Sequence, residues 1–249
     1  FSLGACLGSF ANVCIYRLPK NKQIVSGRSF CPKCKKKINW YDNLPLISFI
    51  ILNRKCRNCN KVIPARYFIV ELITGIAFLL IYLNFKNLNT IIFLSILVLI
   101  LIIIFFIDLE NFIIPDTLNF SIMGLALFKN FLPNFNTSLI HEINQSIIGG
   151  MVGYISIWLI IYLYKIFKKI DGMGLGDAKL MAGIGFLFGW QSIPFVLFVS
   201  SILGLIFVTP SLIKKQKTMR TEIPFGPFII LACLIYFVYG SSIYHLILV

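Results

Sequence analysis

The sequence predicts an all-α, polytopic membrane protein with about eight transmembrane helices and a small cysteine-bearing insert on the cytoplasmic side. Hydrophobic residues make up 58% of the 249 residues and charged residues only 13%, against roughly 45–50% and about 25% in soluble domains. Apolar runs of helical length recur along the chain, and the basic residues fall between particular runs. This composition excludes an ordinary soluble domain, a disordered tail and a disulfide-stapled small protein.

The first apolar run covers residues 1–16 and begins without a Met. Sixteen helical residues rise about 24 Å, short of the ~30 Å membrane core, so we expect a truncated first transmembrane helix. A signal peptide would need a basic n-region and a cleavage site, and neither is visible. The short run 178–190 is a candidate for a half-helix buried in protein. Seven further helices are predicted after the first, over 67–85, 90–107, 117–132, 146–167, 178–190, 191–213 and 225–248.

The 23 Lys and Arg residues outnumber the 9 Asp and Glu residues and give a net charge of +14. In a soluble protein this excess would point to nucleic acid. In an eight-helix chain, however, 21 of the 23 lie on one side, in the connections 17–66, 108–116, 165–179 and 214–224. The other side holds only Lys86 and Lys129. The positive-inside rule therefore places 17–66 in the cytoplasm and both chain ends outside, and topology explains the charge without nucleic acid.

Four cysteines of segment 17–66 form two C-x2-C pairs: Cys31, Cys34, Cys56 and Cys59. Four thiolates are enough for a closed tetrahedral zinc site, and the surrounding Lys and Arg side chains would stabilise them. A metal is physically reasonable because an insert of roughly 50 residues with few large apolar side chains cannot easily build a core. Unmetallated thiols or a redox pair remain the alternatives, although disulfides are disfavoured in the cytoplasm.

Among the nine acidic residues, Asp108 and Asp177 stand apart. Each lies at the cytoplasmic end of a predicted helix, since Asp108 closes the run 90–107 and Asp177 precedes the run 178–190. Ionisable residues at membrane depth are costly and usually face a bundle interior or a water-filled cavity. Two of them at one depth on separate helices can meet. We expect solvated roles for Asp42, Glu142 and Glu222, a turn-shaping role for Asp171, and for Glu71 either an interfacial ion pair or a functional role.

Two neighbouring carboxylates cannot both ionise easily, so they share one proton. In aspartic proteases one carboxylate then takes a proton from water while the other polarises the scissile carbonyl. Gly174 and Gly176 precede Asp177, where they would allow a close backbone approach and a positive φ. The competing interpretation makes Asp177 only the N-cap of the next helix.

Several blocks of the sequence, taken in order, resemble the type IV prepilin peptidases, which are membrane aspartic proteases of the G-x-G-D class. The blocks cover nearly the whole chain, at 8–19, 31–71, 108–116, 172–179 and 223–227. The resemblance implies that Asp108 and Asp177 are the catalytic pair and that Gly174 and Gly176 belong to the supporting motif. The resemblance makes Asp116 a weaker candidate for a catalytic residue than Asp108.

The resemblance also implies substrates and cofactors. The family cleaves the basic leader of prepilins and pseudopilins after a glycine, at the cytoplasmic face of the bacterial inner membrane. Members with the cysteine-bearing insert commonly also methylate the new N-terminal amine with S-adenosylmethionine. No G-x-G-x-x-G fingerprint locates that methyl donor in the sequence.

We therefore predict three parts: a truncated first transmembrane helix over 1–16, a cytoplasmic cysteine-knuckle domain with structural Zn²⁺ over 17–66, and a transmembrane peptidase domain, surrounded by lipid, over 67–249. Two other functions stay open. A membrane redox or metal-handling protein built on the C-x2-C pairs would lose activity on Cys→Ser but keep it on Asp→Asn. For a non-catalytic scaffold with a zinc-ribbon docking module, neither set of residues would matter for turnover.

Overall fold

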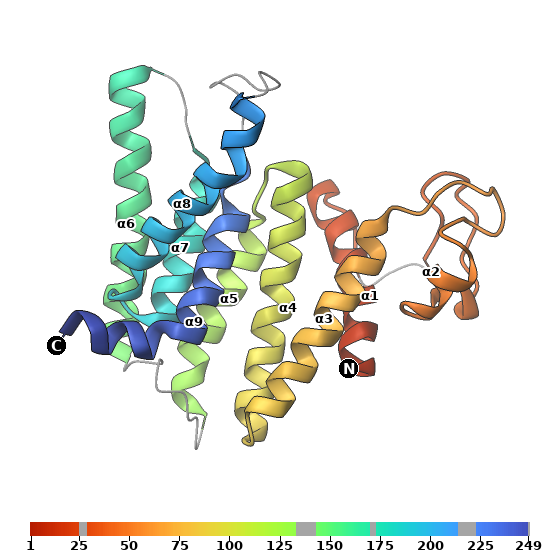
Figure 1. Cartoon of the computed structure of the whole chain (residues 1–249), viewed down its shortest axis with the longest axis horizontal. Coiled ribbons are helices and arrows are strands. Elements are labelled where there is room, and N and C mark those ends of the chain that lie inside the picture. Colours follow the sequence, from red (N-terminus) through yellow and green to blue (C-terminus); the bar gives the residue numbers. More distant parts are fainter. Residues whose placement is uncertain (25–28, 133–142, 170–172, 214–222, 249) are drawn as a thin grey trace. The chain divides into compact units, whose positions relative to one another are not determined.

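The computed structural model describes residues 1–24, 29–132, 143–169, 173–213 and 223–248 (Figure 1). Each of the eight predicted segments is an α-helix. Their bounds are α1 Ser2–Arg17, α3 Ala65–Asn84, α4 Leu88–Asn111, α5 Asp116–Phe128, α6 Ile143–Lys168, α7 Leu175–Phe188, α8 Ser192–Ile213 and α9 Gly226–Leu248. The connections add the short helix α2 (Ile47–Ile51) and 3-10 turns at Leu18–Lys20, Trp40–Asn43 and Lys129–Phe131.

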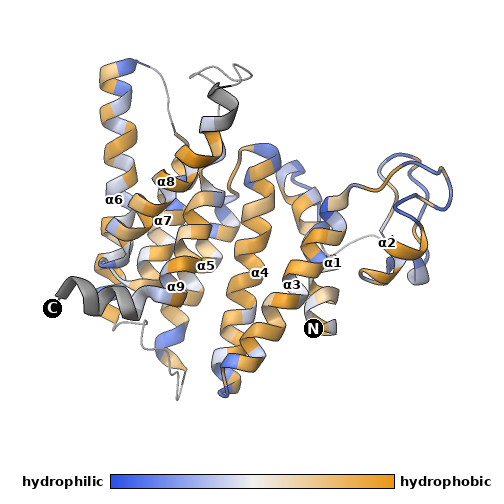
Figure 2. Cartoon of the chain, in the orientation of Figure 1, coloured by the Kyte–Doolittle hydropathy of each residue, from blue (hydrophilic) through white to orange (hydrophobic). Residues whose placement is uncertain are grey.

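Four helices are long and apolar enough to cross a membrane within the described residues: α3, α4, α6 and the Ser192–Thr209 part of α8. The described apolar stretch of α9, Gly226–Gly240, is shorter. Figure 2 shows apolar residues along these helices and hydrophilic residues concentrated in the connection that contains α2. The all-helical membrane fold is thus borne out, while the number of eight spans stays a prediction.

The chain divides into two compact units, Phe1–Ile103 and Ile104–Val249, and the division falls inside α4. In the first unit α1 packs against α3. A buried polar contact joins these two helices, because Asn12 Nδ2 donates to the carbonyl oxygen of Tyr67 at 3.0 Å. The predicted three-part division at residues 16 and 66 concerns membrane topology and stays a prediction.

The cysteine segment of the first unit consists of two knuckles with the same local structure. In each, the backbone N–H of the first cysteine donates to a carbonyl five residues later, from Cys31 to Lys36 and from Cys56 to Lys61. Isolated antiparallel bridges, Phe30 with Lys37 and Lys55 with Val62, close the two knuckles. This local repeat was not predicted, because the two segments share little beyond their cysteines.

Helix α7 is the buried centre of the second unit and contacts α5, α6, α8 and α9. It is apolar on all sides, as expected of a helix enclosed by others. Gly185 of α7 lies directly against Gly149 of α6, and a Cβ on either residue would clash with the backbone of the other. Lys129 is 2% exposed, and its Nζ donates to the carbonyl of Leu187 at 2.8 Å, which satisfies a free carbonyl at the end of α7.

Candidate active site

Asp108 lies in the last turn of α4 and is only 4% exposed. Its Oδ2 accepts a hydrogen bond of 2.9 Å from the backbone N–H of Gly226. Gly226 is the first residue of α9, where backbone N–H groups have no partner inside the helix and carry a partial positive charge. The start of α9 therefore orients the Asp108 carboxylate and stabilises negative charge on it.

Gly226 permits this contact because it has no side chain. A Cβ at this position would lie 2.7 Å from Asp108 Oδ2 and 3.3 Å from its Cγ, closer than side chains pack. Gly226 falls in the block 223–227, and the sequence alone assigns it no role. A glycine directly before Pro227 at a predicted helix start was the available signal, but its partner lies 118 positions away in the sequence.

Asp177 is the third residue of α7 and is 8% exposed. The helix begins at Leu175, two residues before Asp177, whereas the predicted run began after it. Gly174 holds the N-cap position and makes no side-chain cap hydrogen bond. Asp177 is therefore not the N-cap; it is the third helical residue, and its carboxyl group accepts a hydrogen bond from the backbone N–H of Gly174.

The structure brings Asp108 and Asp177 together inside the second compact unit. Their carboxyl groups are close enough to repel each other electrostatically, and both are buried. Burial and mutual repulsion both favour a state in which the pair holds one proton. Such a pair has one group able to accept a proton and one able to donate it, as general acid–base hydrolysis requires.

The two motif glycines act differently from each other. Gly174 has φ −81° and ψ 146°, an extended conformation open to any residue, and Gly189 is the only glycine with a positive φ in the described part of the chain. The expected positive φ at Gly174 and Gly176 is therefore wrong. The expected close approach is present at Gly176, where a Cβ would lie 3.1 Å from the Cβ of Ile114.

Asp116 is not a third carboxylate of the pair, because it forms an ion pair with Lys179. Both of its carboxylate oxygens lie 2.7 Å from Lys179 Nζ, and its side chain is 55% exposed. This ion pair links the first turn of α5 to α7, two residues after Asp177. Asn119, one turn further along α5, donates from Nδ2 to the Gly176 carbonyl at 3.4 Å. Helix α5 thus holds the segment that carries Asp177.

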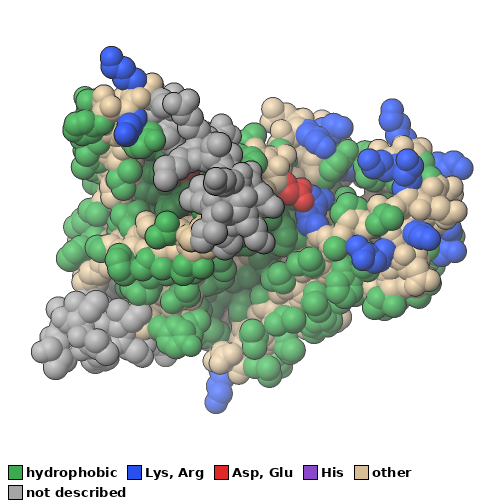
Figure 3. All heavy atoms as spheres, turned by 45° about the horizontal axis from the view of Figure 1, so that its top comes forward, with side chains coloured by type: hydrophobic (Ala, Val, Ile, Leu, Met, Phe, Trp, Pro, Cys, Tyr) green, Lys and Arg blue, Asp and Glu red, His purple; other side chains and the backbone are tan. Residues whose placement is uncertain are grey.

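The four cysteines of the knuckles converge in the first compact unit. The Sγ atoms of Cys31, Cys34, Cys56 and Cys59 all lie within 4.8 Å of one another, and those of Cys31 and Cys59 are 3.9 Å apart. Zinc–sulfur bonds of 2.3 Å in a tetrahedron place the sulfurs about 3.8 Å apart. The four residues therefore fit a tetrahedral metal ion. Lys and Arg side chains gather over this segment, as Figure 3 shows, and offset the charge of thiolates.

The proximity of the four thiols also affects the acidity of Cys59. The Lys61 backbone N–H stabilises the Cys59 thiolate, but desolvation and hydrogen bonds with the other three thiols outweigh it and raise the pKa of Cys59 to about 11. Four thiols this close cannot all ionise without a cation between them. A divalent metal that binds here must therefore displace protons.

The remaining acidic residues in the described chain have structural partners. Asp42, expected to be solvated, accepts a bidentate pair of hydrogen bonds from Arg57, and its side chain is only 9% exposed. The hydrogen bonds that Arg57 donates to Asp42 raise the pKa of the Arg57 guanidinium. Glu71 accepts a hydrogen bond of 2.8 Å from the backbone N–H of Leu46. Several positions discussed from the sequence lie outside the described residues, namely Glu142, Asp171, Gly172 and Glu222.

Comparison with known families matches both parts of the chain. Residues 2–85 match the family described as bacterial peptidase A24 N-terminal domain, which lies within the first compact unit. Residues 95–209 match the type IV leader peptidase family, which includes both Asp108 and Asp177.

Individual relatives extend over nearly the whole chain. A prepilin leader peptidase/N-methyltransferase of Vibrio cholerae is 38% identical over 240 residues, covering 93% of this chain and 92% of the relative. Proteins of the same name from Aeromonas salmonicida and Pseudomonas aeruginosa are each 30% identical, covering 98% and 97% of this chain and 90% and 89% of their own length. No solved structure matches the chain.

Proposed function

This chain belongs to the type IV leader peptidase family, and from that premise we propose that it cleaves the basic leader of type IV prepilins and pseudopilins and methylates the new N-terminus. The observation that carries the peptidase proposal is the buried pair Asp108 and Asp177, which α4 and α7 supply to one compact unit. The methyltransferase proposal rests on the names of relatives similar over almost their full length.

Hydrolysis by this pair needs no covalent intermediate. The ionised carboxyl group removes a proton from a water molecule, whose oxygen attacks the scissile carbonyl carbon. The protonated carboxyl group donates a hydrogen bond to the carbonyl oxygen and stabilises the tetrahedral intermediate. Asp108 accepts a backbone N–H hydrogen bond from Gly226 and Asp177 accepts one from Gly174, so backbone donors orient both carboxyl groups, and the pair as a unit supplies the base and the acid.

We propose an orientation in which the aspartate pair works at the cytoplasmic face. Eight helices, with 21 of the 23 basic residues on one side, place segment 17–66 and the cytoplasmic ends of α4 and α7 on that side. The apolar helix of a prepilin would lie in the bilayer, with its basic leader in the cytoplasm. A glycine before the cut gives the extended, closely fitting backbone that a buried site requires. The host membrane is then the bacterial inner membrane.

Zinc is the proposed ion of the cysteine cluster, held by Cys31, Cys34, Cys56 and Cys59. With all four positions taken by thiolates, the ion has no open site for water and serves structure, not hydrolysis. The mutual proximity of all four sulfurs favours a metal site over two separate redox pairs. This geometry argues against the redox alternative, which needs two thiols to pair with each other and not with the second knuckle.

The test is leader cleavage of a synthetic prepilin by the full chain in detergent, followed by mass spectrometry. Wild-type protein should shorten the substrate and, with S-adenosylmethionine present, add one methyl group to the product. Asp108→Asn and Asp177→Asn should each lower the cleavage rate by at least about 10³-fold, with unchanged membrane insertion. Near-normal cleavage by either variant would overturn the assignment of the pair, and a shortened but unmethylated product would remove the transferase.

A further inference from the structure

The short helix α2 is fixed to the first two turns of α3. The rings of Phe49 in α2 and Phe68 in α3 stack with their centroids 5.2 Å apart. The backbone N–H of Leu46, the N-cap residue of α2, donates to the Glu71 carboxylate in α3 at 2.8 Å. All four residues belong to the first compact unit. These two contacts therefore fix the position of α2 along α3.

The length of α3 gives the depth at which α2 lies. Helix α3 has 20 residues and is long and apolar enough to cross a membrane. At a rise of 1.5 Å per residue it extends about 30 Å, which is the thickness of the hydrocarbon core. All of α3 is thus needed to span the core, and Ala65 lies at the edge of it. Glu71 lies about 9 Å further along the helix, so the start of α2 lies beside lipid.

The outer side of this element is apolar. Ile47, Ile50 and Ile51 have the i, i+3, i+4 spacing that places side chains on one face of a helix. The preceding turn is joined to α2, since Ser48 Oγ donates to the Tyr41 carbonyl at 2.9 Å. Exposed groups of large apolar side chains mark interaction sites, and Trp and Tyr are typical of membrane–water interfaces. Six side chains that are each at least 42% exposed form what we call the apolar face: Trp40, Tyr41, Leu44, Ile47, Ile50 and Ile51.

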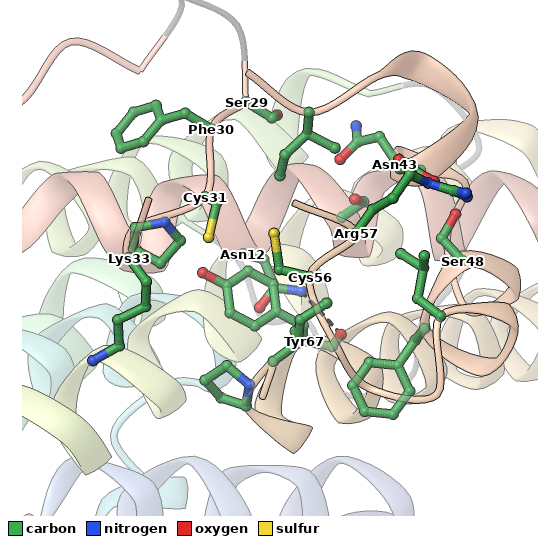
Figure 4. Close-up of a pocket in the computed structure, with 18 of the residues that line it drawn as sticks. Asn12, Ser29, Phe30, Cys31, Lys33, Asn43, Ser48, Cys56, Arg57 and Tyr67 are labelled. Atoms are coloured by element: carbon green, nitrogen blue, oxygen red, sulfur yellow. Dashed lines mark hydrogen bonds and ion pairs between the residues drawn. The ribbon is translucent and has the colours of Figure 1, made fainter. Parts of the chain in front are cut away.

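The inner side of the element carries its polar side chain. Ser48 is only 7% exposed, and it lies with Asn43 and Arg57 in the wall of a cavity of this unit, as Figure 4 shows. The three isoleucines of α2, in contrast, are each more than half exposed. Helix α2 therefore turns its polar side chain toward the protein and its apolar side chains outward, the reverse of a helix that faces water.

The charge around the apolar face suits an anionic lipid surface. Residues 29–63 contain eight Lys and Arg residues and a single acid, Asp42, which is paired with Arg57. Arg54 and Lys55 follow α2 almost directly and are exposed, and such long side chains can extend from an apolar region to lipid headgroups. Basic clusters next to a membrane helix are attracted to anionic lipids. The same charges would repel a basic leader peptide or a second copy of this segment.

We propose that the apolar face inserts into the leaflet of anionic phospholipid beside α3, with the basic residues of the knuckles against the headgroups. The cysteine segment is then embedded in the membrane surface and not suspended above it. Glu71 acts as the residue that holds α2 at this depth. The inference goes beyond the proposed peptidase and transferase, because it requires only that α3 spans the membrane.

The test measures contact between Trp40 and lipid chains, using the full chain in nanodiscs of phosphatidylglycerol. Trp158→Phe and Trp190→Phe leave Trp40 as the only one of the three tryptophans. Brominated acyl chains should then lower Trp40 fluorescence at least about twofold, and water-soluble acrylamide should have little effect. Acrylamide quenching without bromine quenching would place the face in water. Protection from both quenchers would place it against a second copy, and acrylamide quenching that stops when a prepilin is added would assign it to the substrate. Each of these three results would overturn the inference.

A pair of substitutions tests whether the apolar face itself inserts. Ile50 and Val62 are 64% and 63% exposed, but only Ile50 belongs to the apolar face, and Val62 precedes the start of α3. Ile50→Asp should reduce bromine quenching of Trp40 by about half, because a charge in lipid is costly, and Val62→Asp should leave it unchanged. Equal quenching in the two variants would contradict insertion.

The lipid itself provides the test of the charge argument. Phosphatidylcholine with the same brominated chains should quench Trp40 less than phosphatidylglycerol does, and equal quenching would refute the role of the anionic headgroups. None of these measurements uses a substrate of the enzyme for its positive result. Failure of this inference would therefore leave the proposed peptidase standing, and loss of cleavage activity would leave the lipid contact standing.

Discussion

Gly226 shapes the active site through the side chain it lacks. Its N–H reaches Asp108 Oδ2 at 2.9 Å only because no Cβ occupies the intervening space. This makes Gly226 a positioning residue: it holds one carboxylate of the proposed catalytic pair but does not itself need to touch the substrate.

We expect Gly226→Ala to lower leader cleavage about 10- to 100-fold, because displacing a reacting group by about 1 Å can have effects of that size. The loss should fall on kcat more than on KM, which steady-state kinetics with a synthetic prepilin would resolve. Gly124→Ala is the matched control, since a Cβ at Gly124 meets nothing within 4 Å. Equal activity of the two variants would show that Asp108 does not depend on the start of α9.

The ion pair between Asp116 and Lys179 should support the site without being part of its chemistry. Exposed pairs of this kind contribute about 0.2–1 kcal/mol, so Asp116→Asn and Lys179→Gln should each reduce cleavage less than about 10-fold. A double-mutant cycle of cleavage rates should show that the two effects are coupled. If Asp116→Asn abolished cleavage as completely as Asp108→Asn, Asp116 would have to be counted as a catalytic carboxylate.

At the scale of the element, the stability of each knuckle depends on its contact with the other. Each is held by a few backbone hydrogen bonds and one bridge, and the four thiols are the main shared feature between them. Chelation or Cys34→Ser should therefore expose the segment around residues 29–63 to limited proteolysis. Leader cleavage should persist, because both aspartates lie in the other compact unit.

Binding of the proposed zinc ion to the cysteine cluster should also depend on pH, with a defined sign. The Lys61 N–H lowers the pKa of Cys59, but desolvation and the neighbouring thiols raise it to about 11, so the Cys59 thiol is protonated at neutral pH when no metal is bound. Zinc must displace these protons, and its apparent affinity should rise as pH rises. Competition with a chromogenic chelator between pH 6 and pH 8 measures this; an affinity that is flat or falls with pH would exclude thiolate ligation.

At the scale of the whole molecule, the distribution of charge predicts how the chain crosses the membrane. A reporter fused after Lys86, between α3 and α4, should lie outside the cytoplasm, and one fused after Asn111 should lie inside. The reason is the asymmetry of 21 against 2 basic residues. Reversed reporter activities at these two positions would place the aspartate pair on the wrong side for a leader that stays in the cytoplasm.

The sequence was informative wherever the signal is local. The eight helices follow from apolar runs and their polar interruptions, and Asp108 and Asp177 stood out because acids are scarce in such a chain. Predictions that required a neighbour failed or were incomplete. Asp177 proved to lie inside α7 because the helix starts at Leu175, and Asp42 proved to be paired because Arg57 reaches it from the second knuckle.

The sequence by itself therefore determined the helices and singled out the four cysteines and the two acids, since composition and spacing act over a few residues. Only the tertiary structure decided that the start of α9 holds Asp108, that α5 ties Asp116 to Lys179, and that Glu71 of α3 holds the start of α2. Those contacts join residues 25 to 118 positions apart. They depend on how closely helices pack, which is set by the absence of a Cβ or the reach of one side chain and leaves no local pattern in the sequence.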